Sequence, residues 1–108
     1  MSEPKEYPLY QEILDILINS SHLVIFSKTS CGFCTRTKEE IRKLNIEPHI
    51  IELDHHNNGK ELQEALYNRT GRLTVPSVWI NKECIGGCTE TLELIKNELF
   101  LKKLNQQF

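Results

Sequence analysis

Long apolar runs, a strong net charge and a leader-like N-terminus are all missing from this 108-residue sequence. No apolar run approaches the roughly 18 residues that a membrane-spanning helix needs, so we expect no membrane partner. The formal net charge of -2 gives no electrostatic argument for binding nucleic acid. Residues 1–10 lack both the charged-then-apolar order of a secretory signal and the Arg-rich pattern of a mitochondrial leader, which predicts a cytoplasmic, reducing location.

Structural disulfides are a poor explanation for the cysteines of this chain, because the expected location is reducing. The chain has four of them, at Cys31, Cys34, Cys84 and Cys88. With 39% hydrophobic and 26% charged residues, the chain can bury a core of its own without a disulfide or a structural metal. We therefore expect a single domain over residues 1–108, with residues 1–8 as a flexible or loosely packed segment.

The hydrophobic pattern predicts an α/β fold. Amphipathic periodicity predicts helices at Leu9–Asn19, Thr35–Leu44, Lys60–Arg69 and Thr89–Leu104, the last with a break near Asn97. Short apolar runs predict strands at Leu23–Phe26, His49–Leu53, Val78–Ile80 and Glu83–Ile85. A strand–helix–strand unit implies a parallel pair, and a hairpin adds antiparallel strands. The expected architecture is a mixed four-stranded sheet with helices on both faces.

The motif Cys31-Gly32-Phe33-Cys34 lies between a buried strand and a helix, the context in which a Cys-x-x-Cys pair has a redox role. A cysteine at a helix N-terminus faces unpaired backbone N–H groups and the positive end of the helix dipole, and both favour the thiolate. Only the thiolate attacks a disulfide. We therefore predict that the outer Cys31 is the nucleophile and the inner Cys34 resolves its mixed disulfide, with Lys28 adding positive charge.

Two other roles for these cysteines stay open. Cys31 and Cys34 could form half of a zinc site, with Cys84 and Cys88 as the other half. The Cys-x-x-x-Cys spacing of the second pair, and a full α/β core, are unlike a zinc ribbon. The cysteines could also be small buried residues without chemistry.

Two further segments carry weaker signals. Thr74-Val75-Pro76 precedes a predicted strand, and an X–Pro bond that is cis there would turn the backbone of Val75 outward, where an extended peptide could pair with it. An ordinary strand-entry proline explains the segment equally simply. Gly86-Gly87-Cys88-Thr89 opens a helix, and a glycine turn at a helix N-terminus is suited to an anion. A plain strand-to-helix turn is the alternative.

Taken together in this order, the three motifs closely resemble the glutaredoxins, over about residues 10–104. The resemblance implies a thioredoxin-like fold, and a dithiol enzyme that uses glutathione to reduce protein disulfides and protein–glutathione mixed disulfides. By position it implies that Lys28, Phe33 and Gln63 border the site and that Val75 pairs with the cysteinyl part of glutathione. The remaining contacts that it implies are Thr74, Pro76, Gly87, Cys88 and Thr89, with the last three holding the γ-glutamyl carboxylate.

The departures from the family pattern raise a second function. Gly32 and Phe33 replace the Pro and Tyr that glutaredoxins often carry, and some members without that Pro hold a [2Fe–2S] cluster between two subunits. In such a dimer Cys31 and glutathione would be the ligands; otherwise we expect a monomer. Leu73 stands where a basic residue often precedes Thr-Val-Pro, with Arg72 one position earlier, so a contact by Arg72 is in doubt. Thr89-Glu90 stands where Ser-Asp or Asp-Asp often follows Gly-Gly-Cys, so a contact by Glu90 is in doubt too. A redox-inert binding module is the third reading.

Overall fold

The apolar run that predicts the first strand forms the centre of a mixed sheet in the computed structural model, which describes residues 6–106. Strand β1 (Leu23–Ser27) is buried along its whole length. It pairs in parallel with β2 (His49–Glu52) and antiparallel with β3 (Ser77–Ile80), which pairs antiparallel with β4 (Glu83–Gly86). The order β2-β1-β3-β4 confirms the predicted mixed four-stranded sheet.

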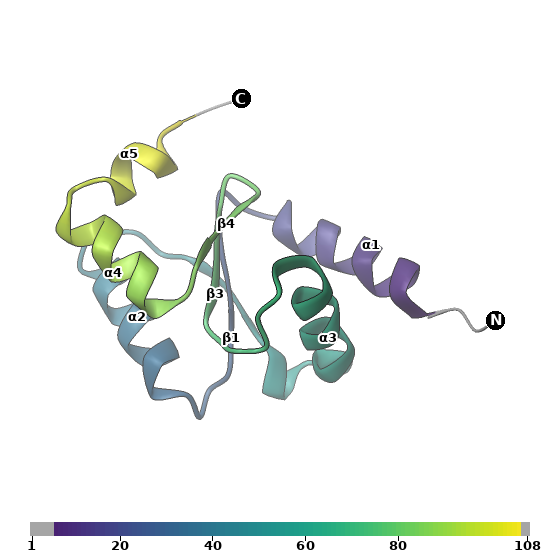
Figure 1. Ribbon diagram of the computed structural model, residues 1–108. Helices are drawn as coiled ribbons and strands as arrows, with labels where there is room; N and C mark the ends of the chain where they lie inside the picture. Colours follow the sequence, from purple (N-terminus) through teal and green to yellow (C-terminus); the bar gives the residue numbers. More distant parts are fainter. Residues whose placement is uncertain (1–5, 107–108) are drawn as a thin grey trace.

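Helices cover both faces of this sheet, as Figure 1 shows. Helices α1 (Glu6–Ile18) and α3 (Gly59–Thr70) lie on one face, and α2 (Gly32–Arg42) and α4 (Cys88–Lys96) on the other, followed by α5 (Phe100–Leu104). Side chains alternate along β1, so Val24 and Phe26 pack under α1 and α3, whereas Leu23 and Ile25 pack under α2 and α4. Each face therefore has its own apolar core.

The element boundaries differ from the sequence predictions at several points. Helix α1 begins at Glu6, before the predicted Leu9, so residues 6–8 of the expected loose segment lie in a helix and residues 1–5 lie outside the described residues. Helix α2 begins at Gly32 because Cys31 is its N-cap. The predicted strand to Leu53 ends at Glu52, and a 3-10 turn, η1 (Leu53–His55), follows. The expected break near Asn97 is confirmed by the end of α4 at Lys96.

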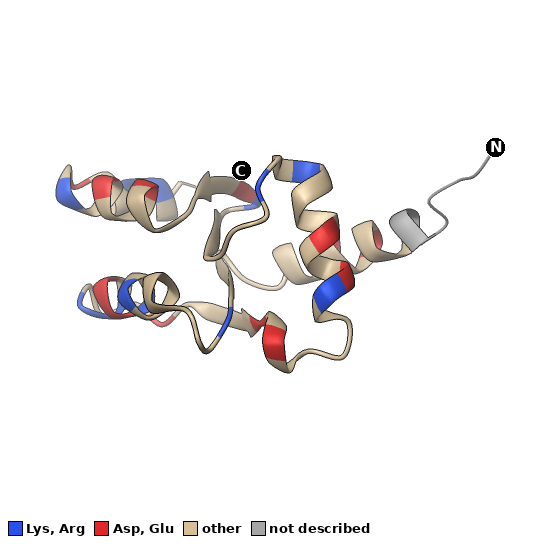
Figure 2. Ribbon diagram, turned by 60° about the horizontal axis from the view of Figure 1, so that its bottom comes forward, with Lys and Arg blue, Asp and Glu red and all other residues tan. Residues whose placement is uncertain are grey.

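The charged side chains show no segregation by sign. Lys, Arg, Asp and Glu are interspersed on the helices of both faces (Figure 2). Among residues 6–106, no helix is long and apolar enough to cross a membrane. The strongest chemical feature is therefore local, at the edge of the sheet where β1 runs into α2.

Candidate active site

Cys31 is the residue on which α2 begins. Its backbone is extended, and its Sγ accepts a hydrogen bond from the Cys34 backbone N–H at 3.4 Å. The N-cap is where a side-chain acceptor satisfies a backbone N–H that the helix leaves unpaired. The Cys31 thiol also lies 3.7 Å from the Val75 carbonyl oxygen, which joins the motif to the segment before β3.

These contacts stabilise the thiolate of Cys31. Burial is the largest single influence on the pKa of this thiol and raises it. Hydrogen bonds from the Cys34 thiol and backbone N–H and from the Phe33 backbone N–H act in the opposite direction, as does the positive charge of Lys38. Together they outweigh burial, so the pKa of Cys31 lies below its ordinary value.

Cys34 has the opposite properties. Its side chain is fully buried under the first turn of α2, and this burial is the main reason that the pKa of Cys34 is raised. Hydrogen bonds from the Lys28 backbone N–H and the Ser27 hydroxyl lower this pKa by less than burial raises it, and the neighbouring Cys31 adds a smaller raising effect. The outer thiol therefore gives up its proton more readily than the inner one.

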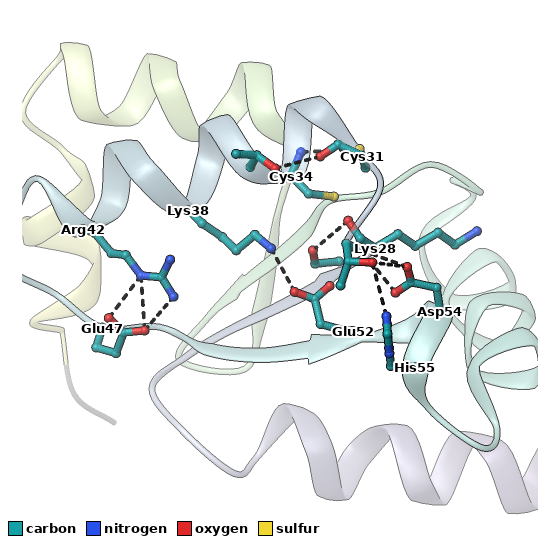
Figure 3. Close-up of polar contacts among 12 residues, drawn as sticks. Lys28, Cys31, Cys34, Lys38, Arg42, Glu47, Glu52, Asp54 and His55 are labelled. Atoms are coloured by element: carbon teal, nitrogen blue, oxygen red, sulfur yellow. Dashed lines mark hydrogen bonds and ion pairs between the residues drawn. The ribbon is translucent and has the colours of Figure 1, made fainter.

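The loop before Cys31 is anchored to η1, as Figure 3 shows. The backbone N–H of Thr29 donates to both Asp54 carboxylate oxygens at 3.1 and 3.0 Å, and its hydroxyl donates to Oδ2 at 2.6 Å. The Thr29 hydroxyl and backbone hold the pKa of Asp54 below its usual range. The side chain of Lys28, the residue before Thr29, extends outward rather than toward Cys31 (Figure 3). Lys38 instead reaches from α2 to β2, where its Nζ lies 2.9 Å from Glu52 Oε2.

A hollow of about 450 Å³ lies next to Val75, the residue whose carbonyl oxygen contacts the Cys31 thiol; Cys31 itself is not among its lining residues. It is lined by Phe33, Arg72, Thr74, Val75, Pro76, Gly87, Cys88, Thr89 and Glu90. One wall is the segment before β3, in which the Val75–Pro76 peptide bond is cis. The other wall is the N-terminus of α4, and a helix N-terminus suits an anion; here the Glu90 carboxylate already accepts the Gly87 backbone N–H. The two segments that the sequence singled out thus face each other across one hollow.

The predicted binding residues are not all in this hollow. Lys28 and Gln63 do not line it, and the Gln63 side-chain amide donates instead to the Leu73 carbonyl at 2.7 Å. Arg72 and Glu90, whose contacts the sequence left in doubt, do line it and form an ion pair. Arg72 and Glu90 lie next to the two predicted segments in the sequence, and this position could have marked them as lining residues. Their ion pair could not be predicted, because it depends on how the two segments pack.

The other two cysteines give no support to a zinc site. All four cysteines are free, and Cys84 lies on β4 with its sulfur 4.0 Å from the Ser77 hydroxyl. No group of three or more His, Cys, Asp or Glu side chains that could hold a metal ion occurs within residues 6–106. Cys88, the first residue of α4, lies at the rim of the hollow.

An ionisable thiol at a helix N-terminus over a buried partner thiol is suited to thiol–disulfide exchange, and here it is carried on a thioredoxin-like fold. The glutaredoxin family model matches residues 23–85, and the chain belongs to this family. Glutaredoxins are glutathione-dependent oxidoreductases.

Individual relatives agree with that assignment. The chain is 42% identical over 89 residues to the mitochondrial glutaredoxin-2 of Pongo abelii, covering 82% of this chain and 55% of that protein. It is 44% identical over 75 residues to a glutaredoxin of Vernicia fordii, covering 69% and 72%. The chain therefore spans about half the length of the mitochondrial relatives that it matches.

Solved structures extend the similarity to three dimensions. A buckwheat glutaredoxin–glutathione complex superposes with a TM-score of 0.89 at 35% identity, covering 95% of this chain and 94% of that one. The holo form of glutaredoxin C1 from Populus tremula x tremuloides gives a TM-score of 0.86 at 36% identity, covering 89% and 95%.

Proposed function

We propose that this chain is a dithiol, glutathione-dependent oxidoreductase that reduces protein–glutathione mixed disulfides and protein disulfides. The main support is the position of the Cys31 sulfur, which caps α2 and lies 3.7 Å from the carbonyl oxygen of Val75, a residue that lines the hollow. A glutathionyl group in that hollow would have its sulfur close to the nucleophile. The glutathione complex of the buckwheat relative supports this choice of ligand.

In the first half-reaction, the Cys31 thiolate attacks the glutathione sulfur of a mixed disulfide. The protein–sulfur bond breaks, and the protein leaves as a thiolate that takes up a proton. In the second, the thiolate of another glutathione attacks the glutathionylated Cys31, which releases glutathione disulfide and restores the Cys31 thiolate. Each turnover therefore consumes one free glutathione, and the glutathionyl group of the substrate becomes the other half of the glutathione disulfide.

For a protein disulfide, Cys34 takes the second step. It loses its proton and attacks the Cys31 sulfur of the mixed disulfide, which frees the second protein thiol and leaves Cys31 and Cys34 oxidised. Two glutathione molecules then reduce that bond. Because Cys34 is fully buried and its pKa is raised, this route needs the inner thiol to be deprotonated as it attacks.

The test is turnover of a glutathione mixed disulfide with glutathione and glutathione reductase. We expect Cys31→Ser to abolish turnover and Cys34→Ser to retain it, whereas reduction of a protein disulfide should need both cysteines. Cys84→Ser is the matched control, because Cys84 is a free, half-buried cysteine that does not line the hollow. Full activity of Cys31→Ser would refute the proposal.

A glutathione-ligated [2Fe–2S] cluster shared by two copies of the chain is the second candidate, and Gly32 favours it. A Cβ at Gly32 would have no atom within 4 Å, so the space beside Cys31 is open. Within the described residues Cys31 has no set of neighbouring metal ligands, so glutathione and a second copy would have to supply the others. Anaerobic reconstitution should give a brown dimer, and Gly32→Pro should remain colourless; a colourless, monomeric wild type would count against the cluster.

The cytoplasmic location predicted from the sequence stays part of this proposal. The chain's relatives include mitochondrial glutaredoxin-2 and the chloroplastic glutaredoxin-C4 of Oryza sativa, so fractionation of cells that express the full-length protein is the appropriate test.

A further inference from the structure

Arg72 and Glu90 join the two walls of the hollow. Arg72 follows Gly71, the residue that ends α3, and leads into the wall that contains Val75. Glu90 lies in the first turn of α4, the opposite wall. Arg72 Nη2 donates to Glu90 Oε2 at 2.8 Å, and Nη1 lies 3.4 Å from Oε1. This Arg72–Glu90 bridge is a two-point contact between segments 18 residues apart in the chain.

The carboxylate end of the bridge is fixed to the backbone. Glu90 Oε1 also accepts the Gly87 backbone N–H at 2.8 Å, which caps α4. A Cβ at Gly86 would come within 2.7 Å of the Glu90 Cγ, so the stem of Glu90 lies directly against the Gly86 backbone. Gly86 has a φ of +116°, which favours glycine on its own account. The arginine thus bonds to a carboxylate with little freedom to move.

The bridge is also a partition. Arg72 and Glu90 line the hollow next to Val75, and they line a second hollow of about 320 Å³ together with Trp79, Cys84 and Gly86. Close to this partition the two walls nearly touch, because a Cβ at Gly87 would lie 3.1 Å from the Pro76 carbonyl oxygen. Loss of the bridge would therefore remove the side-chain link between the walls and leave this close backbone approach and the pairing of β3 with β4.

The bridge is poorly placed to act through overall stability or through its own charge. The side chains are 49% and 40% exposed, and ion pairs that exposed contribute little to stability. The arginine and the carboxylate also neutralise each other, and the pKa of Glu90, lowered to about 2 chiefly by Arg72 and the Gly87 N–H, keeps the pair charged at any working pH. With overall stability and net charge excluded, the bridge acts through the distance at which it holds the two walls.

We propose that the Arg72–Glu90 bridge sets the width of the hollow and thereby the affinity for the glutathionyl group. The inference rests on the proposed function. Arg72 and Glu90 act here as positioning residues: they hold Val75 and the N-terminus of α4 at the separation that one ligand spans, and they leave the chemistry at Cys31 unchanged.

The experiment compares Arg72→Met, Glu90→Gln and the double variant on two substrates. One is a glutathione mixed disulfide, and the other is the matching γ-glutamylcysteine mixed disulfide, which lacks the glycine carboxylate. We expect each single variant to raise KM for both substrates by roughly three- to tenfold, and the double variant to be no worse, because the bridge is one coupled unit. The kcat and the alkylation pH profile of Cys31 should not change.

Arg42→Met is the matched control. Arg42 pairs with Glu47 at 2.8 Å and is 46% exposed, but it lies at the far end of α2 and does not line the hollow. Its removal should leave KM unchanged.

Three outcomes would overturn the proposal. Wild-type KM in both single variants is one. A loss confined to the glutathione substrate in Arg72→Met, with unchanged or improved binding in Glu90→Gln, is the second, because it would make Arg72 a direct contact of the glycine carboxylate. Changed kcat with constant KM is the third.

Calorimetric titration with S-methylglutathione, which cannot react, separates the proposed function from the proposed role of the bridge. A wild type that binds this compound but turns nothing over refutes only the proposed function. A wild type that does not bind it refutes both.

Discussion

Gly59 and Gly32 are the first residues of α3 and α2, and the same alanine substitution should have opposite effects at the two positions. At Gly59, which is buried, a Cβ would lie 1.8 Å from the Leu53 carbonyl oxygen and 2.8 Å from its carbon. Ordinary contacts begin at 3.4 Å, so the start of α3 and η1 must move apart by more than an ångström. Overpacking of this kind usually costs about 1–3 kcal/mol, and because the obstacle is backbone we expect about 3 kcal/mol or more.

At Gly32 the same Cβ meets no atom within 4 Å. Alanine there restricts the unfolded chain without straining the folded one, so we expect a gain of roughly 0.4–1 kcal/mol in the free energy of unfolding. Urea unfolding followed by the fluorescence of Trp79, the single tryptophan, measures both changes. Equal effects at the two glycines, or a Gly59→Ala variant within about 0.5 kcal/mol of wild type, would refute the reasoning from contact distances.

Two further predictions concern charge around Cys31. Lys38→Met should raise the pKa of the Cys31 thiol, so that its alkylation rate rises at higher pH than in wild type, and Lys28→Met should have the smaller effect. A larger effect of Lys28→Met would restore the role predicted for Lys28. Because Thr29 lowers the pKa of Asp54 below its ordinary 3.8, this carboxylate stabilises the fold fully above that pH and progressively less as the pH falls below it. Acid unfolding should therefore be steeper below pH 3.8 in wild type than in Asp54→Asn, and parallel curves would contradict the Thr29 contact.

Features with a local cause could be predicted from the sequence. The run Leu23–Phe26 is short for a helix and wholly apolar, which favoured a strand buried on both faces, and β1 is that strand. The helix after Cys31 and the Gly86-Gly87 turn were equally readable, since each depends on residues adjacent in the chain. The segments that form the two walls of the hollow, around Val75 and at the start of α4, could be predicted for the same reason.

Features that depend on packing between distant segments could not be predicted. Lys28 is three residues from Cys31 in sequence, yet its side chain extends outward, whereas Lys38 is one turn from Cys34 on the same helix face and contributes the positive charge. The helix face shared by Cys34 and Lys38 could be identified only once α2 was known to begin at Gly32. The Arg72–Glu90 bridge likewise requires the register that brings β3 and β4 together.

The inequality of the two thiols has a consequence for how substrates divide between the two routes. After Cys31 has been glutathionylated, the intermediate meets either Cys34 or a second glutathione. Cys34 is close but fully buried, and burial, the main cause of its raised pKa, does not depend on the Cys31 thiol. Glutathione comes from solvent with an ordinary thiol, and its attack gains from concentration. Raising the pH should therefore favour Cys34 more than it favours glutathione, because the thiol with the higher pKa gains the larger relative increase in thiolate. In wild type, the share of turnover through the Cys31–Cys34 disulfide should rise with pH, while Cys34→Ser, which has only the external route, should show the pH dependence of glutathione alone.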